Sequence, residues 1–167
     1  MKLFFLFTLF VASVAGSKYA HCMFKQQEPV SGHICFTEKH GGQVEAHVQV
    51  SGLDRCENYR VHVHEHAPAS DGSCTTVGGH YNWADPQNID EGDMLTLKSN
   101  TESVLHKHIH PLNSALSLNG ERSIIGRSVA IHVGGHKVCC PIVACSKRTY
   151  RHMTRNLESY VHPPVCP

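Results

Sequence analysis

Most of this 167-residue chain is divided into short segments in which apolar and polar residues alternate. Alternation with a period of two is typical of β-strands that bury one face. Turn residues such as Gly41-Gly42 and Asn119-Gly120 separate the segments, and helical spacing is hard to find before Arg148. The pattern predicts an all-β sandwich or barrel with Greek-key connections. The expected strands lie at residues 32–39, 44–50, 61–65, 96–97, 103–110, 114–118, 124–133 and 137–145.

The N-terminus has the features of a secretory signal peptide. Lys2 precedes an apolar run over residues 3–14, and the run ends in the small residues Ala15-Gly16-Ser17. The run is too short to cross a bilayer, and no later apolar run is long enough. We therefore expect a secreted, extracellular protein without a membrane span.

The rest of the chain, after the signal peptide, divides into a β domain and a C-terminal tail. We expect residues 1–17 to be removed, residues 18–146 to form one β domain, and residues 147–167 to form a basic tail, with a short helix over residues 150–160. The tail's lysine and arginines favour an anionic surface as partner, although a solvated terminus is the commoner outcome. The net charge of only +1 gives the chain no strong overall field, and we expect no nucleic-acid partner.

The chain contains eight cysteines, which secretion would expose to an oxidising compartment. An even number allows complete pairing, but the sequence alone permits about 105 connectivities. No pair has zinc-finger spacing, so the cysteines favour disulfides over metal ligation. They are Cys22, Cys35, Cys56, Cys74, Cys139, Cys140, Cys145 and Cys166.

Histidines occur in the pattern of a metal centre. His62 and His64 alternate with Val61 and Val63, so both imidazoles lie on one face of a strand. Neutral imidazole is a good ligand for copper and zinc. His80 follows a Gly-Gly step, and His132 ends another alternating segment. An isolated His-x-His pair is more often a solvated face, but this pair has further histidines to join it.

Several of these motifs resemble the copper/zinc superoxide dismutase family. The resemblance rests on Val-His-Val-His-Glu at 61–65, Cys74 six residues before His80, Gly-Gly-His-Tyr-Asn at 78–82 and the segment 123–132, and it covers roughly residues 28–145. It implies an eight-stranded Greek-key fold and a copper site formed by His62, His64, His80 and His132. It also implies a disulfide between Cys74 and Cys140, with Cys139 as a close rival, because adjacent residues on a strand face opposite ways.

The resemblance is weaker at the family's zinc site. Asp93 matches the zinc-binding aspartate, but Asp90 stands where a histidine is expected, and the other histidine would fall near Asn88. No histidine occurs between His80 and His106. Because zinc favours nitrogen and sulfur donors, we expect copper as the cofactor and no zinc.

The family's long charged loop is also missing. Only seven residues separate His132 from Cys140, which is the pattern of copper-only extracellular members with an open site. Counting back three residues from Cys140 places Lys137 at the position of the family's active-site arginine. A lysine still attracts an anion but lacks the bidentate fork of arginine. His136 is a further candidate, and an ordinary solvated lysine is the competing interpretation.

The activity implied is dismutation of superoxide to oxygen and hydrogen peroxide by redox cycling of copper, with His80 carrying a proton. Without zinc, another group has to orient His80, and Asp85, Asp90 and Asp93 are candidates. Ile124-Ile-Gly-Arg127 resembles a dimer-contact segment of the family, so a homodimer and a monomer both stay open.

The copper site accounts for only four of the fifteen histidines. His106, His108 and His110 share strand parity, so their imidazoles lie on one face, and the resemblance to the family implies that this face points outward. They are candidates for a weak surface site for Zn(II) or Cu(II). Histidine richness and secretion also resemble the superoxide-dismutase-like plasma proteins of molluscs. The alternative function is therefore a histidine-rich metal-binding or transport protein with little dismutase activity.

Overall fold

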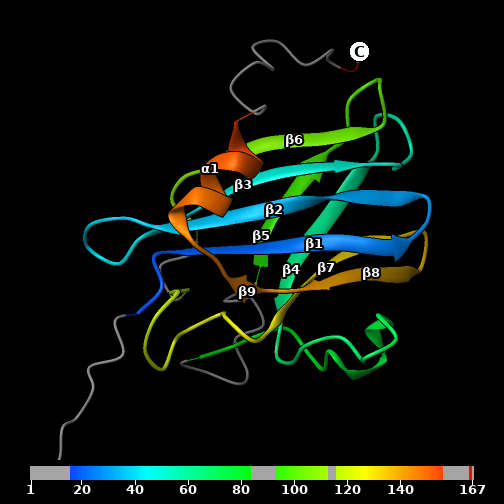
Figure 1. Cartoon of the computed structure of the whole chain (residues 1–167). Coiled ribbons are helices and arrows are strands. Elements are labelled where there is room, and N and C mark those ends of the chain that lie inside the picture. Colours follow the sequence, from blue (N-terminus) through cyan, green and yellow to red (C-terminus); the bar gives the residue numbers. More distant parts are fainter. Residues whose placement is uncertain (1–15, 84–92, 113–115, 156–165, 167) are drawn as a thin grey trace, which may run out of the picture.

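The computed structural model of the chain is a sandwich of two antiparallel sheets (Figure 1). It describes residues 16–83, 93–112, 116–155 and 166. The first sheet has the order β6 (Val104–Ile109), β3 (Val44–Ser51), β2 (Val30–Glu38), β1 (Tyr19–Gln27) and β9 (Val143–Ala144). The second has the order β5 (Asp93–Lys98), β4 (Asn58–His64), β7 (Ser128–Val133) and β8 (His136–Pro141). The predicted all-β sandwich is confirmed.

The core lies between the two sheets and is formed by alternate residues of their strands. Val61 and Val63 of β4 and Ile131 of β7 are fully buried there, together with Ile34 and Phe36 of β2. Burying one such side chain stabilises the fold by about 1.5–3 kcal/mol. Because successive residues on a strand point to opposite faces, this burial directs the intervening residues of β4 and β7 to the outer face of the second sheet.

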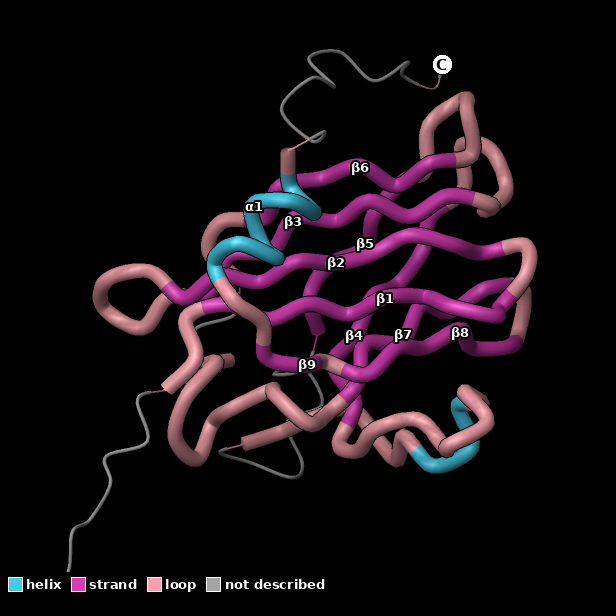
Figure 2. Tube along the Cα trace, in the orientation of Figure 1, coloured by secondary structure: helices cyan, strands magenta, loops and turns pink. Residues whose placement is uncertain are grey.

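The chain crosses between the sheets as a Greek key. β3 pairs with β6, while β4 and β5, which lie between them in sequence, pair with each other in the second sheet. Figure 2 shows the two layers of strands, with the loop that follows β4 below the second sheet. This loop contains the short 3-10 helix Cys74–Thr76 and leads to His80.

Three predicted segments differ clearly from the observed strands, and one observed strand was not predicted. β1 has no counterpart among them, and β7 begins at Ser128 because a turn with positive φ at Gly126 precedes it. Residues 137–145 form β8 and β9, separated at Ile142. Of residues 114–118, only 116–118 are described, and there only Ser117 makes a bridge, with Ser123. Leu116 and Leu118 are buried. Their alternation therefore reflects burial without strand pairing.

The segment that contains Leu118 is held against β2 by a carboxylate. Oε2 of Glu38 accepts hydrogen bonds from the Ser117 hydroxyl at 3.0 Å and the Leu118 amide at 2.7 Å. Oε1 accepts one from the Asn119 side chain at 3.1 Å. Hydrogen bonds to an ionised acceptor are stronger than neutral ones, so Glu38 fixes a segment that no ladder holds.

The expected disulfide between Cys74 and Cys140 is wrong. Cys74 pairs with Cys139, and Cys140 pairs with Cys22 of β1. The physical reason is strand parity: Cys140 lies in the core between the sheets, whereas Cys139 packs with Val77 on the outer face of the second sheet. The two adjacent cysteines of β8 therefore connect it to different parts of the fold: Cys140 to β1 of the first sheet, and Cys139 to the loop after β4. A third disulfide joins Cys56 to Cys166, and Cys35 and Cys145 are free thiols.

The tail forms a helix earlier than expected. α1 spans Lys147–Thr154, and the Ser146 hydroxyl caps it by accepting a hydrogen bond from the Thr149 amide at 3.1 Å. Figure 1 shows α1 lying across the first sheet, where Tyr150 contacts the ring of Tyr19 at 5.0 Å between centroids. Residues 156–160 of the predicted helix and the signal peptide's residues 1–15 lie outside the described residues. Across the described part of the chain, no helix has the length and apolar character that crossing a membrane requires.

The disulfide assignment predicts which thiol each cysteine variant releases. Cys140→Ser should free Cys22, and Cys139→Ser should free Cys74, as measured by differential alkylation and mass spectrometry of the unfolded protein. Each variant should also lose about 2–5 kcal/mol of unfolding free energy in urea. Release of Cys74 by Cys140→Ser would contradict the assignment.

Candidate metal centre

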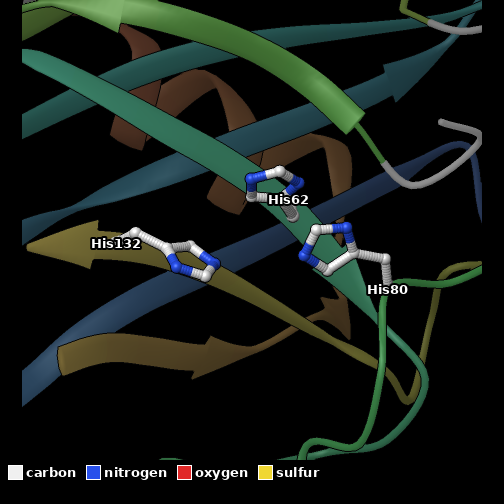
Figure 3. A group of neighbouring side chains, drawn as sticks. All are labelled: His62, His80 and His132. Atoms are coloured by element: carbon white, nitrogen blue, oxygen red, sulfur yellow. The ribbon is translucent and has the colours of Figure 1, made fainter. Parts of the chain in front are cut away.

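Three imidazoles from three parts of the chain converge on the outer face of the second sheet (Figure 3). His62 belongs to β4, His132 to β7 and His80 to the loop after β4. Each offers one nitrogen, and these nitrogens lie within 4.8 Å of one another. The rings of His62 and His80 stack at 3.9 Å between centroids, and those of His62 and His132 meet nearly perpendicularly at 5.0 Å. No other set of three histidine, cysteine or carboxylate ligand atoms lies this close together among the residues that the structure describes.

Strand register brings two of the three together. β4 and β7 are antiparallel neighbours, with Val61 opposite Ile131 and His62 opposite Ala130. The apolar pairs of this ladder, Val61–Ile131 and Val63–Val129, face the core. His62 and His132 must therefore share the opposite face. The approach of these imidazoles therefore follows from the hydrophobic pattern of the two strands.

His80 is positioned by a loop that folds back along β4. The amide of Glu65 donates to the Gly79 carbonyl at 3.1 Å, and the amide of Tyr81 donates to the Val63 carbonyl at 2.8 Å. The Cys74–Cys139 disulfide fastens the same loop to β8. With both ends of the loop held, His80 faces His62 without belonging to a strand of the sheet.

Gly78 permits the sharp turn before His80. Its φ is +74°, a conformation that side chains with a Cβ rarely adopt, and an added Cβ would come within 2.6 Å of Oε2 of Glu65. That carboxylate oxygen already accepts a hydrogen bond from the Gly79 amide at 3.0 Å. Both the positive φ of Gly78 and the position of the Glu65 carboxylate therefore favour glycine over a residue with a Cβ.

His64 is held beside the group by its second ring nitrogen. Nδ1 lies 3.1 Å from the Gly78 carbonyl oxygen, which fixes it as the protonated donor. The ring is buried, with 1% exposure, and lies 5.0 Å from the ring of His80. The structure therefore brings three of the four expected copper ligands together and places His64 at their edge.

The donor set fits a copper ion. Nε2 of His64 and Nε2 of His132 are buried, and neither has a hydrogen-bond partner among the described residues. Desolvation by burial lowers the pKa of His64 to about 4, against a smaller opposing effect of its bond to Gly78. Desolvation also lowers the pKa of His132, with the nearby histidines, Lys137 and Arg60 adding to it. Both side chains are therefore neutral imidazoles at pH 7, which is the ligand form.

A pocket of about 380 Å³ opens beside His132. A tight turn joins β7 to β8, with positive φ at Gly134 and Gly135, so the connection between these two strands adds no long loop beside the site. The pocket is lined by Arg60, His136 and Lys137 in addition to Asn58 and the turn glycines. It is a polar opening with three side chains that carry or can acquire positive charge.

Two cations flank His132 because of register. Lys137 of β8 is directly opposite His132 of β7. On the other side, the register that pairs Val61 with Ile131 brings Arg60 opposite His132 when continued by one residue. The expectation for Lys137 was counted from Cys140, and the same count from the true partner, Cys139, gives His136. Both line the pocket.

Arg60 is the residue that the sequence analysis missed. The signal was present, because Arg60 precedes His62 by two positions and so shares its face. Its proximity to His132, however, depends on the neighbour of β4, which motif spacing does not specify.

The expected zinc-site positions lie largely beyond the described part. Asp85, Asn88 and Asp90 fall outside the described residues, and Asp93 begins β5 opposite His62, with its side chain not described. Of the other predicted metal ligands, His106 and His108 lie on β6 in the first sheet and His110 directly follows it, so they are on a different sheet from His62 and His132.

Comparison with known proteins identifies the family. The family model for copper/zinc superoxide dismutase matches residues 30–140, which include all four histidines and both vicinal cysteines. The chain belongs to the copper/zinc superoxide dismutase family. The matched segment contains β4, β5 and β7 completely and β8 up to Cys140, so it includes both strands that carry His62 and His132.

Individual relatives of this dismutase-family chain are distant. It is 30% identical over 114 residues to the extracellular superoxide dismutase [Cu-Zn] of Drosophila melanogaster, covering 62% of this chain and 59% of that protein. It is 32% identical over 113 residues to a superoxide dismutase [Cu-Zn] of Yarrowia lipolytica, covering 63% and 71%. A cell surface superoxide dismutase [Cu-Zn] of Candida albicans is 31% identical over 116 residues, covering 62% and 36%. The chain thus spans only about three fifths of the Drosophila protein.

The buried histidines predict acid sensitivity of the metal-free protein. Desolvation by burial lowers the pKa of six described histidines, and that of His47 and His64 falls to about 4; the others are His21, His33, His106 and His132. Since the unfolded chain binds these protons near pH 6.5, stability is fully present above that pH and is lost as the pH falls towards 4.

Urea unfolding with a chelator present, at steps from pH 7.5 to 4.5, measures this loss. His47→Gln should flatten the slope, because the variant removes one group that protonates only on unfolding. An unfolding free energy that stays constant between pH 7 and pH 5 would contradict the prediction.

Proposed function

We propose that this chain is a secreted copper-dependent superoxide dismutase that works without zinc. The observation that carries the proposal is the convergence of His62, His80 and His132 within 4.8 Å beside a pocket lined by Arg60 and Lys137. A set of imidazole nitrogens suits copper, and positive side chains at the entrance suit an anionic substrate. Family membership supplies the reaction class.

Copper bound here would supply the redox step, taking one electron from one superoxide and giving it to a second. The protein's residues do the rest. Arg60 and Lys137 attract the anion to the side of His132, where the short turn leaves the approach open. His80 is half-buried on a loop, so its imidazole can hold a proton at the ligand nitrogen and deliver it to the reduced substrate. Two superoxides and two protons yield one oxygen and one hydrogen peroxide.

The absence of zinc from the proposal rests on the sequence. A zinc site next to His80 would need two further histidines, and none occurs between His80 and His106. Carboxylates alone complete a zinc site poorly. In this scheme Asp85, Asp90 or Asp93 would orient His80 in place of the metal.

Secretion is supported by three observations of different kinds. The first 17 residues have the features of a signal peptide, and three disulfides join distant parts of the chain. The Drosophila relative is an extracellular protein by name. In this proposal the mature protein consists of the β domain, residues 18–146, and the basic tail, residues 147–167.

Metal analysis with a dismutation assay tests the function. The cluster of His62, His80 and His132 should bind about one copper and no zinc, and turnover should depend on copper. His132→Ala should lower the copper affinity by at least about tenfold, whereas His152→Ala, an exposed histidine of α1, should leave it unchanged. Several weakly held metals without dismutation would instead favour the alternative of a metal-binding or transport protein.

The role of the pocket cations has its own prediction. Arg60→Gln should slow dismutation about fivefold at low salt, because one charge about 4 Å away is worth ~1 kcal/mol in water. The effect should shrink above 0.1 M salt, where the Debye length is about 10 Å. Arg148→Gln on α1 makes the same change in net charge on the other sheet and should have little effect. Equal rates for Arg60→Gln and wild type at low salt would exclude this role.

A further inference from the structure

A second group of metal-ligating side chains lies on the outer face of the first sheet. Strands β3 and β6 are paired with His47 opposite His108 and Ala46 opposite Ile109. Ala46 and Ile109 are buried in the core, so their neighbours Glu45, His47, His108 and His110 all point outward. The register of β3 and β6 thus brings three imidazoles and one carboxylate together. This group lies on the side of the sandwich opposite the copper-type cluster of His62, His80 and His132.

Glu45 lies at the centre of this group. Its side chain is 8% exposed, and its Oε1 lies 2.6 Å from Nδ1 of His110. Its Oε2 lies 3.6 Å from Nε2 of His108 and 2.9 Å from the Lys39 ammonium. Two imidazole nitrogens and one cation therefore already surround a single shielded carboxylate.

His47 fixes one of the imidazoles. Its ring stacks on that of His108 at 4.1 Å between centroids, with only 5° between the planes. Tyr150 of α1 meets the other side of His47 at 6.3 Å between centroids. Desolvation by burial lowers the pKa of His47 to about 4, with His108 contributing, so His47 is a neutral ring at pH 7. The stack reduces the freedom of His108 while leaving its edge towards Glu45.

The donors are those that Zn(II) and Cu(II) prefer. Imidazole nitrogen combined with a carboxylate oxygen is a common set for both ions, and strands place the donors on a rigid frame. His108 and His110 are each about half exposed, at 50% and 49% of the side chain, so they can turn towards a cation without displacing the core. A dication would also replace Lys39 as the counter-charge of Glu45.

We propose that Glu45, His108 and His110 form a second divalent-cation site, with His47 stacked behind His108. The site takes Zn(II) or Cu(II) and does not depend on the proposed dismutase function. Its donors do not converge as those of His62, His80 and His132 do. We therefore assign this site to carriage or storage of metal and not to redox turnover.

Zinc titration of the full-length, metal-free protein tests this site. Calorimetry and equilibrium dialysis at pH 7.5 should show one zinc fewer per chain in His108→Gln/His110→Gln than in wild type. The same difference should persist in a His62→Ala/His132→Ala background, which lacks the copper-type cluster. Loss of the dismutase function would leave this result unchanged, so the two proposals fail separately.

Single substitutions assign the ligands. Glu45→Gln should weaken zinc binding at this site at least about tenfold. Lys39→Gln should tighten it about fivefold, because it removes a competing positive charge from the carboxylate. His106→Gln is the matched control: His106 lies on the same face of β6, but its cross-strand neighbour is Gln49. Circular dichroism and thermal unfolding verify that each variant is folded.

Two results would overturn the proposal. If His106→Gln weakens zinc binding as much as His108→Gln/His110→Gln, the metal is spread over surface histidines without a defined site. If neither Glu45→Gln nor Lys39→Gln changes the affinity, the cation does not lie on Glu45. Opposite effects of these two substitutions, with His106→Gln within twofold of wild type, establish the site.

Discussion

The pairing of β4 with β7 is the constraint on which the metal centre depends. Val61, Val63 and Ile131 have to enter the core, and this requirement alone sends His62 and His132 to the same outer face. A slip of one residue would bury the imidazoles and expose the valines. The hydrophobic energy of the core therefore maintains the arrangement of the ligands, and the Cys74–Cys139 disulfide adds the loop that carries His80.

Sequence patterns were sufficient for features that depend on one strand and insufficient for those that depend on two. The shared face of His62 and His64, and that of His106, His108 and His110, follow from alternation within a strand. The approach of Arg60 to His132 and of Glu45 to His110 requires the register between strands, so neither was predicted. The Cys74 pairing failed for a related reason: the choice between Cys139 and Cys140 depends on which of them faces the core, and the family resemblance pointed to the wrong one.

The two faces of the sandwich carry different kinds of site. On the second sheet, histidines converge beside an open, positively lined pocket, which suits a redox metal and a small anion. On the first sheet, histidines surround a shielded carboxylate beneath the C-terminal helix, which suits a retained dication. Membership of the copper/zinc superoxide dismutase family explains the first arrangement. The proposed second site would let one chain combine the proposed turnover at one face with metal retention at the other.

Electron paramagnetic resonance of the protein loaded with one equivalent of Cu(II) tests the central claim most directly. We expect one dominant copper species with coupling to several imidazole nitrogens. This species should be unchanged in His108→Gln/His110→Gln and absent in His62→Ala/His132→Ala, where copper bound at the second site should give a different signal. Addition of superoxide should establish a steady state between oxidised and reduced copper. Survival of this same dominant species in His62→Ala/His132→Ala, or a mixture of weakly coupled species in the wild type, would contradict the account of a redox copper centre built by β4, β7 and the His80 loop.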